Sequence, residues 1–199
     1  MTRRAPAAGL LALTLLAILP GAACSHRSRR ATAPEPAPAP NPTTPPAIHL
    51  EVAATTIDGS DPPGDDVVAG VSQALDRYVA TAIVAPLASG QPVADLSPAF
   101  TASAAAEIAA DASLRATVLD EGLPPATREI SAPRATAILD AVNGPGGTDL
   151  VGARIGLTVH AAGPGLDVDI ARDGELVLVA EGGAWKIDVV HLRTERNTR

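Results

Sequence analysis

The stretch that decides the fold runs from Leu150 to Arg193 and reads LVGARIGLTVHAAGPGLDVDIARDGELVLVAEGGAWKIDVVHLR. Glycine-containing turn signals interrupt it at residues 163–165, 173–174 and 182–183. Apolar and polar residues alternate in most of the intervening segments, with the two-residue period of a half-buried strand. The segment 175–181 is apolar on both faces, as expected of a strand that is covered on both sides. The pattern predicts four short strands joined in an antiparallel meander.

Two helical stretches precede the meander. Apolar residues recur at helical spacing from about residue 65 to Pro86, which predicts an amphipathic helix that ends at the proline. Residues 97–122 carry helix-opening signals at Ser97 and at Ser113, so they form either two short helices or one bent helix. The residues of this second stretch that should face the core are Phe100, Ile108, Leu114, Val118 and Leu119.

Two further segments read as strands. Residues 48–57 alternate weakly and are expected to add an edge to the sheet. The segment that follows residue 127 contains Pro133, which would break a central ladder, so this strand is either interrupted or lies at an edge. The fold class that follows is α+β, with amino-terminal helices packed on a curved antiparallel sheet.

Composition limits the kinds of site that the chain can build. The hydrophobic fraction of 46% is ample for a core, but the only aromatic residues are Tyr78, Phe100 and Trp185, so the core must be aliphatic. Residues 1–30 hold five arginines and no acid, which leaves ten basic against 22 acidic residues, a net charge of −12, in the remainder. An acidic body repels phosphate backbones, so we expect no nucleic-acid partner.

The amino-terminal segment has the layout of an export signal. It reads MTRRAPAAGLLALTLLAILPGAAC, with two arginines, an apolar stretch and small residues before the only cysteine, Cys24. This segment resembles a bacterial lipoprotein signal, which implies a signal peptide over residues 1–23 and a diacylglyceryl group on Cys24. Two alternatives stay open. An ordinary signal peptide could be removed without lipidation, or Ala5–Cys24, 20 uncharged residues, could span the membrane as an uncleaved helix.

A proline-rich spacer follows the cysteine. Residues 24–47 are dominated by Ala-Pro repeats, which neither helix nor sheet accommodates. Such a segment is extended and semi-rigid, and it would hold the globular domain, residues 48–199, away from a membrane surface. Since Cys24 is the only cysteine, the chain forms no internal disulfide and no multi-cysteine metal site.

The order of helices followed by a meander that closes with Gly183, Trp185 and Ile187 resembles the nuclear transport factor 2-like fold. The family includes SnoaL-like and ketosteroid-isomerase-like proteins. The resemblance implies a cone-shaped sheet around a pocket, with Trp185 as a packing anchor. Because this fold hosts enzymes, small-ligand binders and dimerisation modules, it does not determine the function.

Few residues have the pattern of a catalytic site. Lone histidines at 160 and 191 are the best pocket candidates, but neither has a nucleophile or a metal ligand beside it in sequence. Asp167 and Asp169 are expected on a solvated outer face, and Asp188 is expected to point away from the face that Trp185, Ile187 and Val189 share. No phosphate-binding loop, zinc spacing or nucleophile elbow is present, so we expect neither cofactor nor metal.

These observations predict a membrane-anchored, extracytoplasmic lipoprotein of a Gram-positive, actinobacterial cell surface. The predicted role is non-enzymatic, with the domain binding either a partner protein or a small apolar ligand. One alternative is an extracytoplasmic SnoaL-like or isomerase-like enzyme that acts on a small apolar substrate through His160 or His191. Another is a collapsed cone whose open sheet face forms a homodimer.

Overall fold

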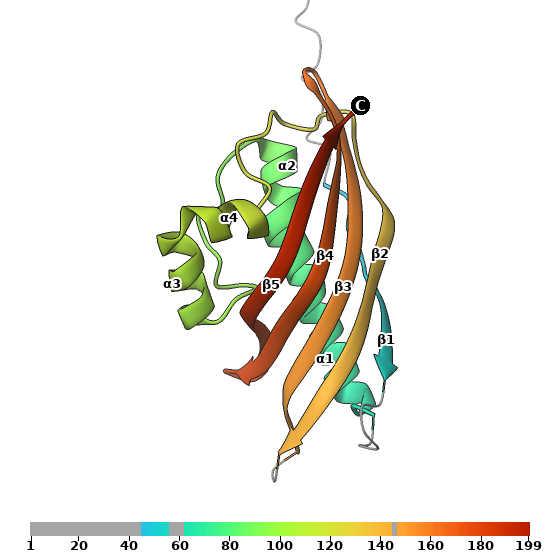
Figure 1. The fold of residues 1–199 in the computed structure, drawn as a ribbon, viewed down its shortest axis with the longest axis vertical. Helices are drawn as coiled ribbons and strands as arrows, with labels where there is room; N and C mark the ends of the chain where they lie inside the picture. Colours follow the sequence, from blue (N-terminus) through green and yellow to red (C-terminus); the bar gives the residue numbers. More distant parts are fainter. Residues whose placement is uncertain (1–44, 56–61, 145–146) are drawn as a thin grey trace, which may run out of the picture. The chain divides into compact units, whose positions relative to one another are not determined.

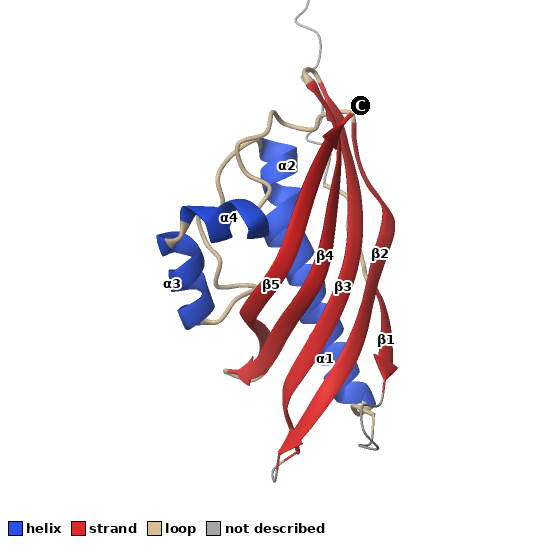
Figure 2. Ribbon diagram, viewed as in Figure 1, coloured by secondary structure: helices blue, strands red, loops and turns tan. Residues whose placement is uncertain are grey.

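A computed structural model describes residues 45–55, 62–144 and 147–199, which belong to one unit, Pro42–Arg199. The predicted signal peptide, Cys24 and most of the predicted spacer lie outside the described residues. In order, the elements are β1 (Glu51–Thr55), α1 (Asp65–Tyr78), η1 (Val79–Val84), α2 (Ala85–Ser89), α3 (Ala102–Ala110), α4 (Ala112–Val118), β2 (Glu129–Gly144), β3 (Gly147–Gly163), β4 (Leu166–Glu181) and β5 (Ala184–Thr198). Helices lie on one face of a curved five-stranded sheet (Figures 1 and 2), which confirms the α+β class.

The first helical run continues past the proline at which it was predicted to end. Pro86 lies in the first turn of α2, directly after the π-helical segment η1. A proline lacks the N–H that would bond the carbonyl four residues earlier, that of Ala82. Instead, the backbone N–H of Asp120 donates to this carbonyl at 2.9 Å. The run ends at Gly90, whose φ of 66° suits glycine at a helix terminus.

The second helical stretch forms two short helices rather than one bent helix. Thr101 caps α3, because its Oγ1 accepts the N–H of Ala104 at 3.2 Å. Asp111 separates the two helices and caps α4 through its carboxylate. The helices therefore begin at Thr101 and Asp111 instead of at the predicted Ser97 and Ser113. Four of the predicted core residues, Phe100, Ile108, Val118 and Leu119, are buried, and Leu114 is partly buried.

The sheet order is β1-β2-β3-β4-β5. Strands β2 to β5 pair in the antiparallel direction, and β3 to β5 form the predicted meander; β1 pairs with β2 in the parallel direction, so the sheet is mixed. Strand β2 is irregular between Ser131 and Arg134, and β1 covers it only from Thr136 to Asp140. Pro133 thus lies in a stretch of β2 that is both interrupted and at an edge, as its missing N–H requires.

The predicted turn at Asp173-Gly174 is wrong. Strand β4 is continuous through both residues, and within 150–193 the chain reverses at the turns after β3 and after β4. Gly174 has a φ of 151°, and a Cβ at this position would lie 2.1 Å from the carbonyl oxygen of His191 on β5. The glycine is needed for the close approach of two strands, and the predicted four strands of the meander are three.

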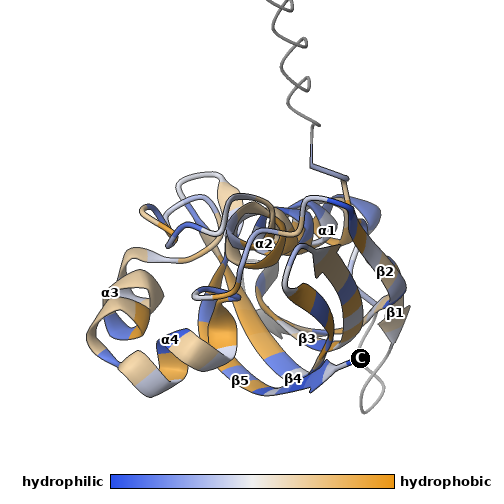
Figure 3. Cartoon of the chain, turned by 90° about the horizontal axis from the view of Figure 1, so that it is seen from above, coloured by the Kyte–Doolittle hydropathy of each residue, from blue (hydrophilic) through white to orange (hydrophobic). Residues whose placement is uncertain are grey.

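Buried aliphatic side chains fill the space between helices and sheet. Figure 3 shows hydrophobic stretches on the helices and strands that border this space. The rings of Tyr78 and Phe100 meet edge to face at 5.9 Å within this space. The opposite, outer face of the sheet is not covered by any element of the described residues. Val177 and Val179 project from that face and are partly exposed, so the prediction that this strand is covered on both sides is wrong.

Trp185 packs at the rim of the core and is only partly buried. Its ring lies on Gly70 of α1, where a Cβ would be 2.5 Å from Cδ1 of the tryptophan. Asp188 is an extra residue in β5, because Ile187 pairs with Leu178 and Val189 with Val177. This bulge reverses the alternation, so Ile187 faces the core while Val189 is exposed, and the prediction that the two share a face is wrong.

Candidate functional site

The inner face of the sheet is closed by packing. Side chains at its centre are at most 1% exposed, so they border no water-sized space. They are Leu157, Val159, Ile170, Leu176 and Leu178. A ligand at this position would have to displace core side chains rather than enter an existing cavity.

His160, the first histidine candidate, lies on the outer face. It is directly opposite Asp169 on the neighbouring strand, and its Nδ1 is 2.9 Å from Oδ1 of that carboxylate. Nε of Arg199 donates to Asp169 Oδ2 at 2.7 Å. The hydrogen bond from Arg199, together with that from His160, outweighs burial and lowers the pKa of Asp169 below its ordinary value. The carboxylate is therefore ionised at neutral pH, and His160 Nδ1–H is the donor.

Asp169 was correctly predicted on the outer face, but its pairing with His160 was missed. The sequence signal for this pairing was the tight turn between β3 and β4. In this hairpin Gly163 is opposite Leu166, so the residue three before Gly163 is opposite the residue three after Leu166. The dyad lies on the outer face of the sheet, where the side chains of His160 and Asp169 are 15% and 25% exposed. Neither residue lines one of the hollows described below.

His191, the second candidate, is exposed and lines an open hollow of about 590 Å³ between α4 and β5. The residues that share this hollow come from the α3–α4 region and from β4 and β5. They are Asp111, Ser113, Leu114, Thr117, Asp173, Val190, Leu192 and Arg193. The two histidines are thus not brought together, since His191 pairs with Glu175 far along the sheet from His160.

The remaining predicted acids have surface or structural positions. Asp167 is exposed, as predicted. Asp188 accepts a hydrogen bond from Oγ1 of Thr101 at 2.8 Å, and the same hydroxyl caps α3. The Asp188 bulge therefore fastens the start of α3 to β5, and it is a structural rather than a catalytic feature.

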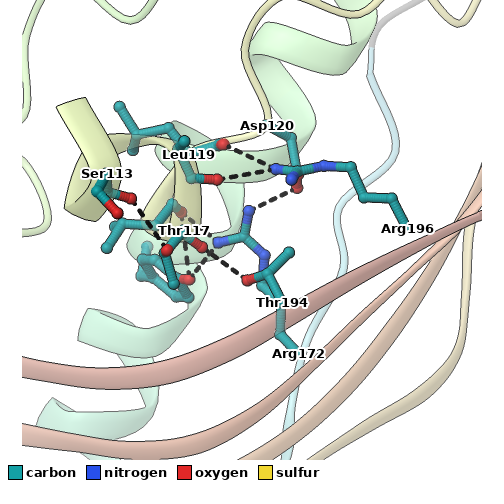
Figure 4. Close-up of polar contacts among 10 residues, drawn as sticks. Ser113, Thr117, Leu119, Asp120, Arg172, Thr194 and Arg196 are labelled. Atoms are coloured by element: carbon teal, nitrogen blue, oxygen red, sulfur yellow. Dashed lines mark hydrogen bonds and ion pairs between the residues drawn. The ribbon is translucent and has the colours of Figure 1, made fainter.

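A buried ionic cluster was not predicted at all (Figure 4). Arg172 on β4 and Asp120 after α4 are each 1% exposed, and their Nη2 and Oδ2 atoms lie 2.9 Å apart. Nη1 of Arg172 donates to the hydroxyl of Tyr78 at 2.7 Å and to the carbonyl of Val118. Nη2 of Arg196 donates to the second oxygen of Asp120 at 3.0 Å. The cluster ties the segment after α4 to both the long helix and the sheet.

Electrostatics keep the cluster in one charge state. Burial is the main cause that raises the pKa of Tyr78, and the nearby Arg172 opposes it only in part, so the phenol stays neutral. Burial disfavours the charged form of Arg172, yet Tyr78 and Asp120 outweigh it and hold the pKa of the guanidinium above its ordinary value. The sequence held a signal for this cluster, because Arg172 continues the inward alternation of Leu166, Val168 and Ile170.

Exposed apolar side chains gather on the outer face of the sheet. Among the described residues, the large hydrophobic side chains that are exposed are Ile138, Val142 and Val189, and all three belong to this face. Half-buried apolar neighbours on adjacent strands extend the cluster. We call this set the outer-face patch, and it consists of Ile138, Val142, Leu150, Val177, Val179 and Val189.

Ion pairs border the outer-face patch. Arg154 lies 3.7 Å from Asp140, and Arg134 lies 3.3 Å from Asp173 across a glycine, Gly156. A Cβ at Gly156 would meet the Arg134 guanidinium at 2.3 Å, so the arginine side chain lies flat over the strand. The face therefore presents an apolar centre beside charges of both signs.

The chain matches no known family model, no curated protein and no solved structure in comparisons of each kind. In the part of the chain that the structure describes, no group of three or more His, Cys, Asp or Glu side chains is arranged to hold a metal ion. The same part contains one helical run, Asp65–Ser89, that is long and apolar enough to cross a membrane. Many of its apolar residues are buried in the core of the domain.

Proposed function

We propose that the protein is an extracytoplasmic lipoprotein, anchored through Cys24, whose domain is a non-enzymatic protein-interaction module that binds through the outer face of its sheet. The observation that carries the interaction role is the contrast between the two faces. The inner face is packed solid, whereas the outer face bears the exposed hydrophobic side chains of the described residues. Exposed apolar clusters with a polar rim are typical of protein-binding surfaces.

The anchoring part of the proposal rests on the sequence. Arginines, an apolar stretch and Ala22-Ala23-Cys24 resemble a lipoprotein signal, although Gly21 stands where leucine is usual, and the proline-rich spacer that follows suits a domain held off a membrane. Confinement to a membrane would raise the local concentration of the domain, so that a modest surface can still form a complex.

The size of the outer face suits a protein partner. Strands β2 to β5 have 15 to 17 residues each. At a spacing of ~4.8 Å and a rise of ~3.3 Å per residue they cover roughly 1,000 Å². A standard protein interface buries about 800 Å² on each partner, so the face is large enough for one. Because charges of both signs flank the patch, a second copy of the chain is the simplest partner that would match it, and we propose a homodimer through the sheet.

The packed inner face also bears on the cone-like fold. We propose a filled version of the nuclear transport factor 2-like cone, because the helices and the meander follow the expected order while core side chains occupy the place of a ligand. A small apolar ligand is therefore a weaker candidate than a protein partner.

One observation favours the enzymatic alternative, namely the 2.9 Å contact between His160 and Asp169. An oriented imidazole is what general-base chemistry requires. Its position on the outer face of the sheet, opposite the packed core, favours the binding module. Isomerase activity that is lost in His160→Ala but kept in His191→Ala would reverse this preference.

The proposed interface is tested with full-length protein in detergent. Native mass spectrometry should show a dimer for the wild type and a monomer for Val142→Asp, which places a charge in the outer-face patch. Glu51→Asp, an exposed change on β1, is the control that should leave the dimer intact. A dimer that persists in Val142→Asp contradicts the proposed surface. A monomeric wild type contradicts the homodimer.

A further inference from the structure

The outer edge of β5 contacts other segments at its start and near Thr194, and between these contacts the backbone of 189–193 has no partner on that side among the described residues. At the start of the strand, residues 99–101 already pair with it, because Thr101 N–H donates to Ile187 O at 2.9 Å and Ile187 N–H donates to Ala99 O at 2.9 Å. At the end of the strand, Oγ1 of Thr194 donates to the carbonyl of Thr117 on α4 at 2.7 Å. The hollow that His191 lines lies between these two contacts.

In the free part, 189–193, the backbone has partners on one side only. An edge strand directs alternate N–H and C=O groups away from its neighbour. Within the described ranges, no backbone hydrogen bond links 189–193 to any segment other than β4. Figure 1 shows β5 at the margin of the sheet, with α3 and α4 beside it. The edge is thus open where the hollow gives access to it.

We propose that this hollow binds an extended, cationic segment of a partner protein, which adds to β5 as a further strand. The intramolecular strand 99–101 shows that the β5 edge accepts such pairing and does so in the parallel direction. After residue 101 the chain turns away from β5 and enters α3. A partner segment would lie beside 189–193, in line with residues 99–101. Strand addition obtains affinity from main-chain hydrogen bonds and specificity from alternate side chains.

The residues that line the hollow indicate which side chains the partner segment would carry. Val190, Leu192 and Leu114 are partly buried and pack against the core, so they offer apolar contacts to every second residue of an added strand. Asp111, Asp173 and Arg193 also line the hollow; Asp173 lies 3.3 Å from Arg134 and Arg193 lies 2.6 Å from Glu195, whereas Asp111 has no ion pair among the described residues. The charge of Asp111, together with the acidic body of the chain, favours basic residues next to the apolar ones.

The test uses fluorescein-labelled KVTVTVTK and full-length protein in detergent, with fluorescence anisotropy as the readout. Saturable binding is expected, and methylation of alternate backbone nitrogens of the peptide should weaken it at least tenfold, because it removes the ladder without altering side chains. Ser113→Trp, which fills the hollow, should weaken binding at least tenfold. Ala116→Trp, on the same helix but lining a different hollow, should not.

Absence of binding, or binding that is insensitive to either methylation or Ser113→Trp, would overturn the inference. Val142→Asp separates this site from the proposed dimer surface. It should leave peptide binding unchanged whether or not it disrupts the dimer. Loss of peptide binding in Val142→Asp would place the peptide on the outer face and contradict strand addition to β5.

Discussion

Arg172 and Asp120 form an ion pair that is almost completely withdrawn from water, with Nη2 and Oδ2 2.9 Å apart. Removal of one partner leaves an uncompensated charge in the core. We therefore expect Asp120→Ala to lower the free energy of unfolding by about 3–5 kcal/mol, as measured by urea denaturation.

An exposed ion pair provides the control for the buried one. Arg134 and Asp173 lie 3.3 Å apart, with both side chains more than half exposed, so Asp173→Ala should cost less than about 1 kcal/mol. Replacement of the buried pair by Asp120→Leu and Arg172→Met together should restore much of the loss, because no lone charge then remains in the core; Arg196, the second cation on Asp120, has a side chain that is 33% exposed and reaches water. If Asp120→Ala and Asp173→Ala lowered the free energy of unfolding equally, the buried pair would contribute no more to stability than the exposed one.

Gly174 permits the contact between β4 and β5. A methyl group there would lie 2.1 Å from a backbone oxygen, which cannot move without separating the strands. Gly182, in the turn before β5, also has a positive φ, but a Cβ there would have nothing within 4 Å. Gly182→Ala should cost about 1 kcal/mol for backbone strain alone, and Gly174→Ala at least 2 kcal/mol more. Thermal denaturation that ranks the two variants equally would contradict the close approach.

Gly70 and Trp185 are predicted to be coupled. Replacing glycine by alanine in a helix interior normally raises the free energy of unfolding by about 0.5–1 kcal/mol. At position 70, however, the new Cβ would overlap the tryptophan ring. Gly70→Ala should therefore destabilise the wild type and stabilise the Trp185→Ala variant, whose own cost should be about 2 kcal/mol because the ring is only partly buried. A double-mutant cycle by urea denaturation measures this change of sign. If Gly70→Ala stabilised both the wild type and the Trp185→Ala variant, the contact between Gly70 and the Trp185 ring would be contradicted.

Asp169 should contribute to stability in a pH-dependent way. Its pKa is lowered in the folded protein, chiefly by the hydrogen bond from Arg199, so its contribution is complete above the unfolded value of about 3.9. The contribution is lost as the pH falls through the folded value. The difference in unfolding free energy between the wild type and Asp169→Asn should thus be larger at pH 7 than at pH 3. A difference that is constant across this range would show that the carboxylate charge is not stabilising.

Local patterns predicted most of the elements. The helical spacing before Pro86 and the alternation of the meander depend on neighbours in sequence, and both gave the right kind of element. The parallel pairing of β1 could not be predicted, because it joins segments that lie far apart in the chain. The same limit applies to Gly174, which looks like a turn residue until the strand beside it is known.

The candidate site was less predictable than the fold. His160 was singled out from the sequence, but its carboxylate partner became evident only once the β3–β4 register aligned it with Asp169. Arg172 was not singled out from the sequence, although it directly precedes the predicted turn at Asp173-Gly174 and keeps the inward spacing of the strand. Contacts that depend on register or on a bulge, such as that at Asp188, need the three-dimensional structure.

Intact-mass spectrometry of the protein extracted from the membranes of its own host tests whether the domain is held at a membrane through a lipid on Cys24. We expect a chain that begins at Cys24 and carries the added mass of a diacylglyceryl group. We also expect Cys24→Ala to abolish both the lipid mass and the cleavage. A wild-type chain that begins at Met1, or one cleaved near residue 24 without any lipid, would contradict the proposed anchoring.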